Sequence, residues 1–326
     1  MAIVCVLCVT IIPRTAVGAG TDGARTEPID VVRAIMATSD GKIDLARAKL
    51  TFDKLVDPRV DIAGAPRQID GMTRTIRQMA GPDAPMRLRL TMLRRYIYEA
   101  GPWNGNKPFA YDLSDPLGQK PANRLLTTYL GTRRGTCVSM PVLFVVLAQR
   151  LGLNATLSTA PDHMFVKHVD DATGQTFNLE TTSGAHVARD IWFRQNMSMT
   201  DAAIASGIYM KTLSRKEALV VLADVVLEHA FAEGRFQEAW DLAEMLRPYY
   251  RNDLAVLLTP SQAALGLVKE EYLDRYKTKA DIPVELLPRL EYLQREVSLA
   301  LNRAYGLGWR ESDGQTQATR PTGASP

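Results

Sequence analysis

The spacing of apolar residues predicts a helical N-terminal portion. From Ile29 to Tyr98, apolar side chains recur three or four positions apart, which is the period of an amphipathic helix. Turn-forming clusters at residues 39–41, 64–66 and 81–85 divide this stretch into several helices. Residues 101–120 are rich in Gly, Pro and Asn, so we expect a loop there.

The middle of the chain is predicted to form helices followed by antiparallel strands. Helical periodicity returns at residues 123–130 and 142–151, and Gly152 is a typical helix end. Three short segments with an extended pattern follow, at residues 155–160, 163–169 and 176–182. Residues 170–174 have the composition of a turn, which makes the last two strands antiparallel. We therefore expect an α+β fold in which a helix bundle packs on a small antiparallel sheet.

The residues from about Arg215 onward predict an all-α C-terminal unit. Four of its residues have the spacing of a tetratricopeptide helix pair: Ala230, Gly234, Phe236 and Ala239. Only one such repeat is visible, whereas repeat arrays need about three to be stable, so a helical hairpin packed on the preceding domain is the simpler interpretation. These patterns predict a domain at 20–205, a tetratricopeptide-like helical domain at 206–310 and a disordered tail at 311–326.

Composition and charge exclude several classes of protein. Hydrophobic residues make up 46% of the chain and charged residues 23%, which are ordinary globular values and exclude a disordered or multi-span membrane protein. The net charge of +3 is spread along the chain rather than concentrated in blocks. We therefore expect neither nucleic acid nor an anionic membrane surface as a partner.

The first residues predict a signal peptide at 1–19. An apolar run at 3–12 is followed by the small residues Gly18 and Ala19, although no basic residue precedes the run. The run is shorter than the ~20 apolar residues that a membrane-spanning helix needs. We expect a periplasmic or secreted protein with no membrane span after processing, and a buried N-terminal strand is the alternative.

Export would leave Cys137 as the only cysteine of the mature chain, because Cys5 and Cys8 lie inside the predicted signal peptide. Pro141 follows Cys137 by four residues and opens an apolar helix, and proline is best tolerated in the first turn. Cys137 is therefore expected at a helix N-terminus, where the positive dipole end favours a thiolate. Arg133 and Arg134 would add to this effect. The alternative is a small buried residue that closes the core.

A nucleophilic cysteine needs a general base, and His163 is the strongest candidate because it opens a predicted strand. His168 lies on the opposite face of that strand. His186 and His229 have a loop-like and a helical context, so we interpret them as surface or packing residues. No metal-ligand pattern is present, so catalysis should need no metal or other cofactor.

An acidic group normally orients the imidazole of such a base, and Glu180 is the candidate. A turn centred within 170–174 places the residue after Glu180 opposite His163. Glu180 therefore shares a face with His163 only if the register is shifted by one residue. The same shift would place Asn178 opposite Phe165, and Asn178 is the reserve candidate.

Three segments resemble the transglutaminase-like superfamily: LLTTYLGTRRGTCVSMPVLFVVLAQRLGL at 125–153, APDHMFVK at 160–167 and FNLETTSG at 177–184. The chain is most similar to the bacterial SirB-type branch, which has a helical portion before the core and a tetratricopeptide-like tail after it. The resemblance implies a papain-like core in the catalytic domain at 20–205, with Cys137, His163 and Glu180 as the catalytic residues. Glu180 stands where active transglutaminases usually have Asp.

The expected reaction is cysteine-dependent acyl transfer on a peptide or protein substrate, through a thioester on Cys137. Water or an amine could accept the acyl group, so hydrolysis and crosslinking both remain open. Trp103, Asn123 and Asn178 are candidates for the substrate cleft, with aromatic packing and helix capping as the alternatives for the first two. The competing hypotheses are a non-catalytic peptide-binding module and an assembly scaffold, with the C-terminal helices as a partner surface.

Overall fold

The computed structural model describes residues 27–116 and 118–311. The predicted signal peptide at 1–19 lies outside these residues. So does the predicted tail at 311–326, apart from Glu311.

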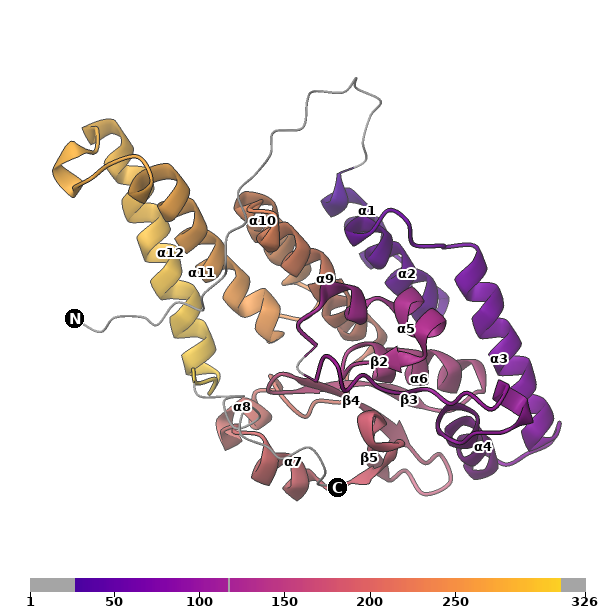
Figure 1. Cartoon of the computed structure of the whole chain (residues 1–326). Coiled ribbons are helices and arrows are strands. Elements are labelled where there is room, and N and C mark those ends of the chain that lie inside the picture. Colours follow the sequence, from indigo (N-terminus) through magenta and orange to yellow (C-terminus); the bar gives the residue numbers. More distant parts are fainter. Residues whose placement is uncertain (1–26, 117, 312–326) are drawn as a thin grey trace.

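Helices make up most of the described chain (Figure 1). Those before the sheet are α1 (Pro28–Met36), α2 (Leu45–Val56), α3 (Gly64–Ala80), α4 (Met86–Tyr98), α5 (Leu126–Thr132) and α6 (Ser139–Arg150). Those after it are α7 (Asp190–Asn196), α8 (Asp201–Ala205), α9 (Arg215–Ala232), α10 (Phe236–Leu246), α11 (Leu254–Val268) and α12 (Leu287–Gly306).

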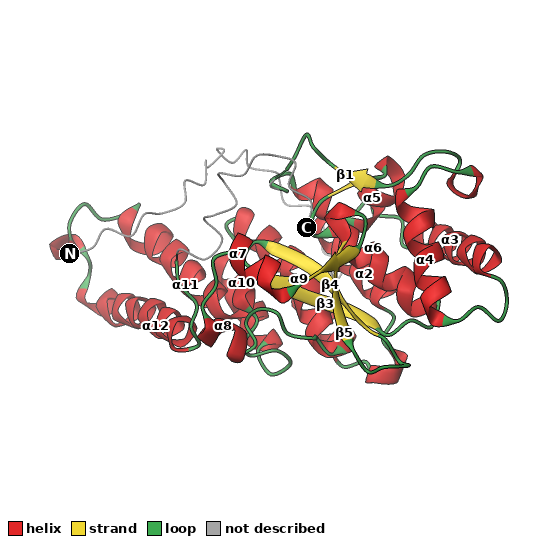
Figure 2. Ribbon diagram, turned by 90° about the horizontal axis from the view of Figure 1, so that it is seen from below, coloured by secondary structure: helices red, strands yellow, loops and turns green. Residues whose placement is uncertain are grey.

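A small antiparallel sheet lies near the middle of the molecule, where it packs against α6 and α9 (Figure 2). Its strands pair in chain order and are β3 (Ala155–Ala160), β4 (His163–Val169), β5 (Thr176–Glu180) and β6 (His186–Ala188). A separate parallel pair joins β1 (Ala110–Tyr111) to β2 (Arg134–Gly135), and it ties the loop after α4 to the segment before α6. The α+β prediction, with a small antiparallel sheet and a helical C-terminal part, is confirmed.

Helix α6 forms the centre of the core. Every residue from Ser139 to Ala148 is buried, because the helix is apolar on all sides and packs against β3, β4 and the helices α3, α4 and α5. Two arginines bind its carboxyl end: Arg77 donates to the carbonyl oxygen of Arg150 at 2.5 Å, and Arg89 to that of Leu151 at 3.1 Å. Positive charges at this end of a helix interact favourably with its dipole, so the two arginines help to hold α6 in place.

The core continues across the predicted domain boundary at residues 205 and 206. Helix α9 packs along α2, and the largest cluster of buried apolar side chains includes Leu50 of α2, Leu147 of α6 and Leu222 of α9. Figure 1 shows α9 and α10 beside the N-terminal helices, while α11 and α12 extend away from them. The boundary itself stays a prediction.

No helix in the described ranges is long and apolar enough to serve as a membrane span.

A buried ion pair joins α2 to α5. Lys49 and Asp53 lie one turn apart on α2, form a salt bridge, and are 1% and 0% exposed. Asp53 also accepts a hydrogen bond from the backbone N–H of Leu126 at 2.8 Å, at the first turn of α5. Burial raises the pKa of Asp53, while the Lys49 charge and both hydrogen bonds oppose that shift.

Candidate active site

Cys137 precedes α6 by two residues, at the opening of the helix where Pro141 led us to expect it. The backbone N–H of Met140 donates to the carbonyl oxygen of Thr136 at 3.1 Å, so the first helical turn encloses Cys137. The Thr136 N–H in turn donates to Ser139 Oγ at 3.1 Å. Cys137 is partly exposed, whereas the apolar helix behind it is buried.

A tight hairpin turn places His163 beside Cys137. Ala160 of β3 pairs with His163 of β4, which leaves only Pro161 and Asp162 in the turn. Proline presets the first position of such a turn, and Asp162 adopts the left-handed conformation, with φ of 51°, at the second. The Cys137 thiol donates to the carbonyl oxygen of Asp162, with 3.8 Å between sulfur and oxygen.

The strand register brings Glu180 to the same face as His163. Lys167 pairs with Asn178, so Glu180 lies diagonally from His163, next to Phe165. The expected one-residue shift occurs, but in the opposite direction. The prediction that Asn178 would face Phe165 is therefore wrong. The turn holds six residues rather than five, because Asp170 and Gln175 close it with a backbone hydrogen bond of 2.9 Å.

The imidazole of His163 is held by a buried carboxylate. His163 Nε2 donates to Glu180 Oε2 at 2.7 Å, and Glu180 is only 1% exposed. The other carboxylate oxygen, Oε1, accepts from the backbone N–H of Thr182 at 3.0 Å and from its hydroxyl at 2.6 Å. These bonds fix the orientation of Glu180. Because Nε2 of His163 bonds to Glu180, Nδ1 is the ring nitrogen that can bond to the Cys137 thiol.

The electrostatic environment of His163, with Cys137 and Glu180 beside it, favours a protonated imidazole. Burial alone would lower the pKa of His163, but attraction to Glu180 and hydrogen bonds to Cys137 and Glu180 raise it to about 10. Burial raises the pKa of Glu180, but the charge of His163 and the hydrogen bonds outweigh this, and the net shift is downward. The raised pKa of His163 therefore favours the cationic imidazolium, which is the kind of neighbour found beside reactive cysteines.

Trp103 and Asn123, two of the predicted cleft residues, contact protein groups. The guanidinium of Arg95 lies 4.5 Å from the centre of the Trp103 ring. The side-chain amide of Asn123 donates to Asp112 at 3.1 Å and to Asp115 at 2.8 Å, which closes the loop between β1 and α5. Their roles in substrate binding stay predictions.

The side chain of Asn178 joins the sheet to α7, whereas Glu180 is the residue that bonds to His163. Its oxygen accepts from Lys167 Nζ at 2.9 Å, and its amide donates to the Ala188 carbonyl oxygen at 3.1 Å and to Asp190 at 2.6 Å. Helix α7 in turn carries Phe193, whose ring centre lies 6.3 Å from that of His163. Asn178 thus supports the helix that packs beside the imidazole.

Two residues that pair with the segment before Cys137 were not among the site residues predicted from the sequence. Tyr111 ends β1 and pairs with Gly135, and the N–H of Asp112, the next residue, donates to the Gly135 carbonyl oxygen at 2.8 Å. The sequence places both residues in a loop, and a loop sequence does not show which strand it will pair with. Asp162 also borders the site, and its position in the sequence, directly before His163, could have indicated this.

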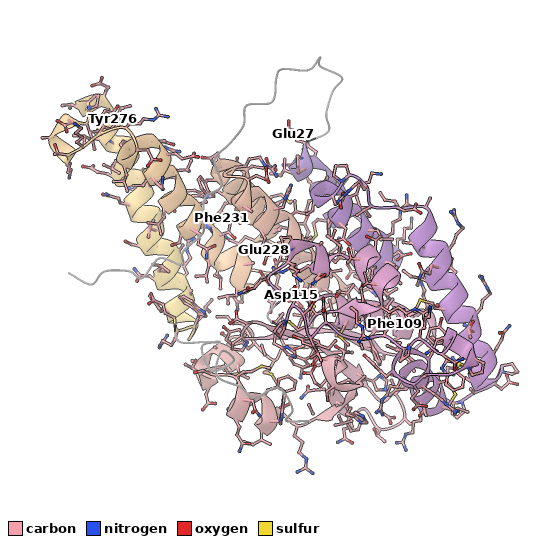
Figure 3. All side chains as sticks on the ribbon, in the orientation of Figure 1. Glu27, Phe109, Asp115, Glu228, Phe231 and Tyr276 are labelled. Carbon is pink, nitrogen blue, oxygen red and sulfur yellow. The ribbon has the colours of Figure 1, made fainter. Side chains whose placement is uncertain are left out.

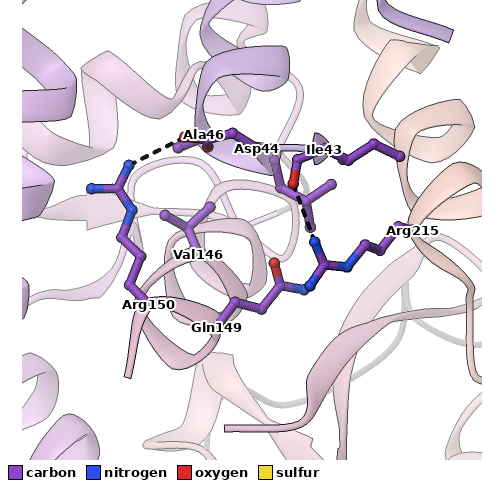
Figure 4. Close-up of a pocket in the computed structure, with 8 residues that line it drawn as sticks. Ile43, Asp44, Ala46, Val146, Gln149, Arg150 and Arg215 are labelled. Atoms are coloured by element: carbon purple, nitrogen blue, oxygen red, sulfur yellow. Dashed lines mark hydrogen bonds and ion pairs between the residues drawn. The ribbon is translucent and has the colours of Figure 1, made fainter. Parts of the chain in front are cut away.

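A separate pocket lies at the far end of α6. It has a volume of about 220 Å³ and lies between α2, α6 and the start of α9, lined by Asp44, Gln149, Arg150 and Arg215, among others (Figure 4). Arg150 pairs with Asp44 at 3.6 Å, and Arg215 donates to the Ile43 carbonyl oxygen at 3.3 Å. Since Cys137 precedes the amino end of α6, this pocket is not part of the Cys137 site.

Comparison with known families supports the sequence resemblance over part of the chain. Residues 64–200 match the family model Transglut_core2, the transglutaminase-like superfamily. The matched region contains the whole antiparallel sheet, α6 and the three residues Cys137, His163 and Glu180. The chain matches neither a curated protein nor a solved structure. The superfamily resemblance is thus confirmed for this region, and the SirB-type branch and tetratricopeptide tail stay predictions.

Proposed function

We propose that the transglutaminase-like region at residues 64–200 catalyses cysteine-dependent acyl transfer on peptide or amide bonds. The observation that carries this proposal is the position of His163, between a helix-opening cysteine and a buried carboxylate. A merely structural histidine has no need of both neighbours, whereas a nucleophile, a base and an orienting acid need this order.

The three side chains can divide the reaction between them. The Cys137 thiolate attacks the amide carbonyl carbon, a C–S bond forms, and the carbonyl oxygen takes the negative charge. As the C–N bond breaks, the imidazolium of His163 gives its proton to the departing amine and a thioester remains. Neutral His163 then removes a proton from water or an amine, which attacks the thioester and releases Cys137. Glu180 orients the imidazole and stabilises its cation throughout.

The backbone at the start of α6 supplies a candidate group for the developing oxyanion. Cys137 precedes the helix, and the first N–H groups of a helix have no partner within it. The Cys137 N–H is therefore a candidate donor for the oxyanion, as in other acyl-transfer enzymes.

Thiol reactivity tests the proposal against a non-catalytic role. We expect iodoacetamide to alkylate Cys137 in the folded protein near pH 7, faster than it alkylates a free cysteine peptide, because the adjacent imidazolium favours the thiolate. His163→Ala should slow this reaction, and His229→Ala, on α9, should leave it unchanged. Alkylation of Cys137 only after unfolding would favour the peptide-binding module or scaffold.

The pH dependence of acyl transfer should reveal the role of Glu180. In the wild type, activity should fall on the alkaline side near pH 10, where His163 loses its proton. Glu180→Gln removes the strongest influence that raises the pKa of His163, so the alkaline limb should move to lower pH. The measurement is kcat/KM from pH 6 to 10.5 on folded protein. If the alkaline limb stays at the same pH in this variant, a group other than His163 controls it.

The remaining parts of the chain support two further proposals. We propose that the C-terminal helices bind a protein partner, since α11 and α12 extend away from the N-terminal helices and from the Cys137 site. We also propose export by residues 1–19, from their apolar run. Cell fractionation should recover a mature chain that starts near Gly20, and a full-length cytoplasmic protein would contradict export.

A further inference from the structure

The short turn between β5 and β6 carries the groups that orient Glu180. Glu180 ends β5 and pairs with His186, the first residue of β6. Its carboxylate accepts from the N–H and the hydroxyl of Thr182, and its carbonyl oxygen accepts from the N–H of Ala185 at 2.8 Å. Because these donors belong to the turn at 181–185, a displacement of the turn would take them away from Glu180.

The shape of this turn depends on contacts with the rest of the protein. Gly184 and Ala185 both adopt the left-handed conformation, with φ of 77° and 53°. Glycine adopts it without steric cost, whereas alanine is disfavoured there and needs surrounding contacts to hold it. The side chain of Ala185 is 0% exposed, so packing in the core supplies one such contact. A side chain of α4 supplies another.

Arg94 of α4 bonds to this turn at two points. Its Nε donates to the Gly184 carbonyl oxygen at 3.1 Å. One terminal nitrogen lies 2.8 Å from Nδ1 of His186 and 3.4 Å from Nε2. Because arginine can only donate hydrogen bonds, His186 must accept here, and the shorter distance assigns Nδ1 as the acceptor. This contact therefore requires a neutral imidazole with its proton on Nε2.

Helix α4 is a firm support for Arg94. Leu93 and Ile97, which flank Arg94 on the helix, are 0% and 1% exposed. The chain also returns to the end of α4 at Phe109 (labelled in Figure 3), and the Phe109 N–H donates to the Ile97 carbonyl oxygen at 2.7 Å. The guanidinium thus extends from a helix that is packed and bonded in the core.

A second residue of α4 lies near both Arg94 and Glu180. Tyr98 follows Arg94 by one helical turn, and its hydroxyl is buried. Burial raises the pKa of Tyr98, the charges of Tyr129 and Glu180 raise it further, and the charge of Arg94 opposes this shift. Arg94 and Glu180 thus act on the same side chain, in agreement with the bonds from α4 to the turn.

We propose that Arg94 is a positioning residue for the proposed acyl transfer. It fixes the turn at 181–185, and the turn keeps Thr182 bonded to Glu180. Glu180 in turn keeps the imidazole of His163 oriented. The inference rests on the proposed function and adds to it a residue that acts through the turn, because the hydrogen bonds described for Arg94 go to Gly184 and His186.

The sign of the change in the pKa of His163 separates positioning from a direct effect of charge. Arg94 is a cation, so its loss would by itself raise the pKa of His163, because a positive neighbour disfavours the imidazolium. Loss of positioning has the opposite effect. Attraction to Glu180 and hydrogen bonds to Cys137 and Glu180 raise this pKa, and a loosened Glu180 contributes less. We expect Arg94→Met, which keeps the aliphatic bulk, to lower it by about 0.5 to 1 pH unit, the equivalent of one hydrogen bond.

Imidazole NMR measures this pKa without any substrate. The chain has four histidines, so full-length protein labelled only with nitrogen-15 histidine gives one set of imidazole signals for each of them. Single His→Gln variants assign the signals. A titration from about pH 6 to 10.5 then gives the pKa of His163, and the nitrogen chemical shifts give the tautomer of His186.

Matched variants test the route from Arg94 to His163. His186→Ala removes one of the two contacts at an exposed position, so it should fold and lower the pKa of His163 less than Arg94→Met does. In a Glu180→Gln background, Arg94→Met should have no further effect, since both act through the same carboxylate. Arg87→Met is the control, because Arg87 lies on the same helix but bonds Asp170 at 3.0 Å, beyond the other end of β4. It should leave the pKa unchanged.

An unchanged or raised pKa of His163 in folded Arg94→Met would overturn the inference. A decrease of the same size in the Glu180→Gln background would also overturn it, because Arg94 would then not act through Glu180. So would a His186 that carries its proton on Nδ1, since this tautomer cannot accept from Arg94.

Peptide assays separate these outcomes from failure of the proposed function. If the protein catalyses acyl transfer, Arg94→Met should lower kcat about threefold to tenfold, the rate equivalent of one hydrogen bond, with little change in KM. The loss should be smaller than that of Glu180→Gln. A lowered pKa of His163 without acyl transfer in any variant or the wild type would retain the positioning role of Arg94 and reject the enzyme.

Discussion

Replacing Cys137 with Ala is expected to abolish acyl transfer, with a loss of roughly 10³-fold or more, because the covalent intermediate can no longer form. His163→Ala should cause a loss of similar size, since no other group carries the proton that the imidazole gives to the departing amine and then takes from the acceptor. Glu180→Gln should reduce the rate less, because the carboxylate orients the imidazole and forms no bond to substrate. The measurement is kcat for each variant with the best peptide substrate found.

His229→Ala is the matched control for the base. His229 lies on α9, its pKa is lowered mainly by burial, and its charged neighbours in the described part of the chain are Arg235, Glu233 and Glu238 rather than residues of the Cys137 site. Its rate should stay within a small factor of the wild type. A loss as large as that of His163→Ala would mean that the base is misassigned. Equal and small losses in all of these variants would favour a binding module over an enzyme.

Lys49→Met is expected to destabilise the protein by about 3–5 kcal/mol, because it leaves the Asp53 carboxylate buried without its partner. Removing Lys49 also removes an influence that lowers the pKa of Asp53, so the folded pKa should rise further. A carboxyl group whose pKa is higher in the folded state than in the unfolded state lowers the free energy of unfolding as the pH rises above the unfolded pKa. The deficit should therefore be larger at pH 7 than at pH 4. Urea unfolding at both pH values measures it.

Two further variants test whether the pair itself is responsible. Lys42→Met changes an exposed lysine just before α2 and should cost little. Lys49→Met combined with Asp53→Leu removes both charges and should recover part of the loss, although the Leu126 N–H at the start of α5 then lacks its acceptor. No recovery in the double variant would mean that packing around Lys49, rather than charge, dominates.

The sequence predicted the local placement of Cys137 and His163 because short-range chemistry determines both. Pro141 restricts where a helix can begin, so Cys137 had to lie near the opening of α6. Pro161 followed by Asp162 suits a tight turn, so His163 had to open a strand. In each case the residues that determine the structure lie within four positions of the residue of interest.

The register between β4 and β5 could not be read from the sequence with the same certainty. Turn composition located the reversal within 170–174, but a turn of five or six residues changes every cross-strand pair. The observed pairing includes Gln175 in the turn, where the Asp170 side chain accepts from Ala172 and Thr173. Which side chain meets His163 therefore depended on one residue of turn length.

The sequence by itself determined that the chain has an α+β fold with a helix-opening cysteine and a strand-opening histidine, because apolar periodicity and proline geometry act over a few residues. Only the tertiary structure decided that Glu180 binds His163, that Asn178 supports α7, and that Asp112 bonds to Gly135, two residues before Cys137. Those pairings join segments far apart in the chain. They depend on how helices and strands pack, which no local pattern of residues specifies.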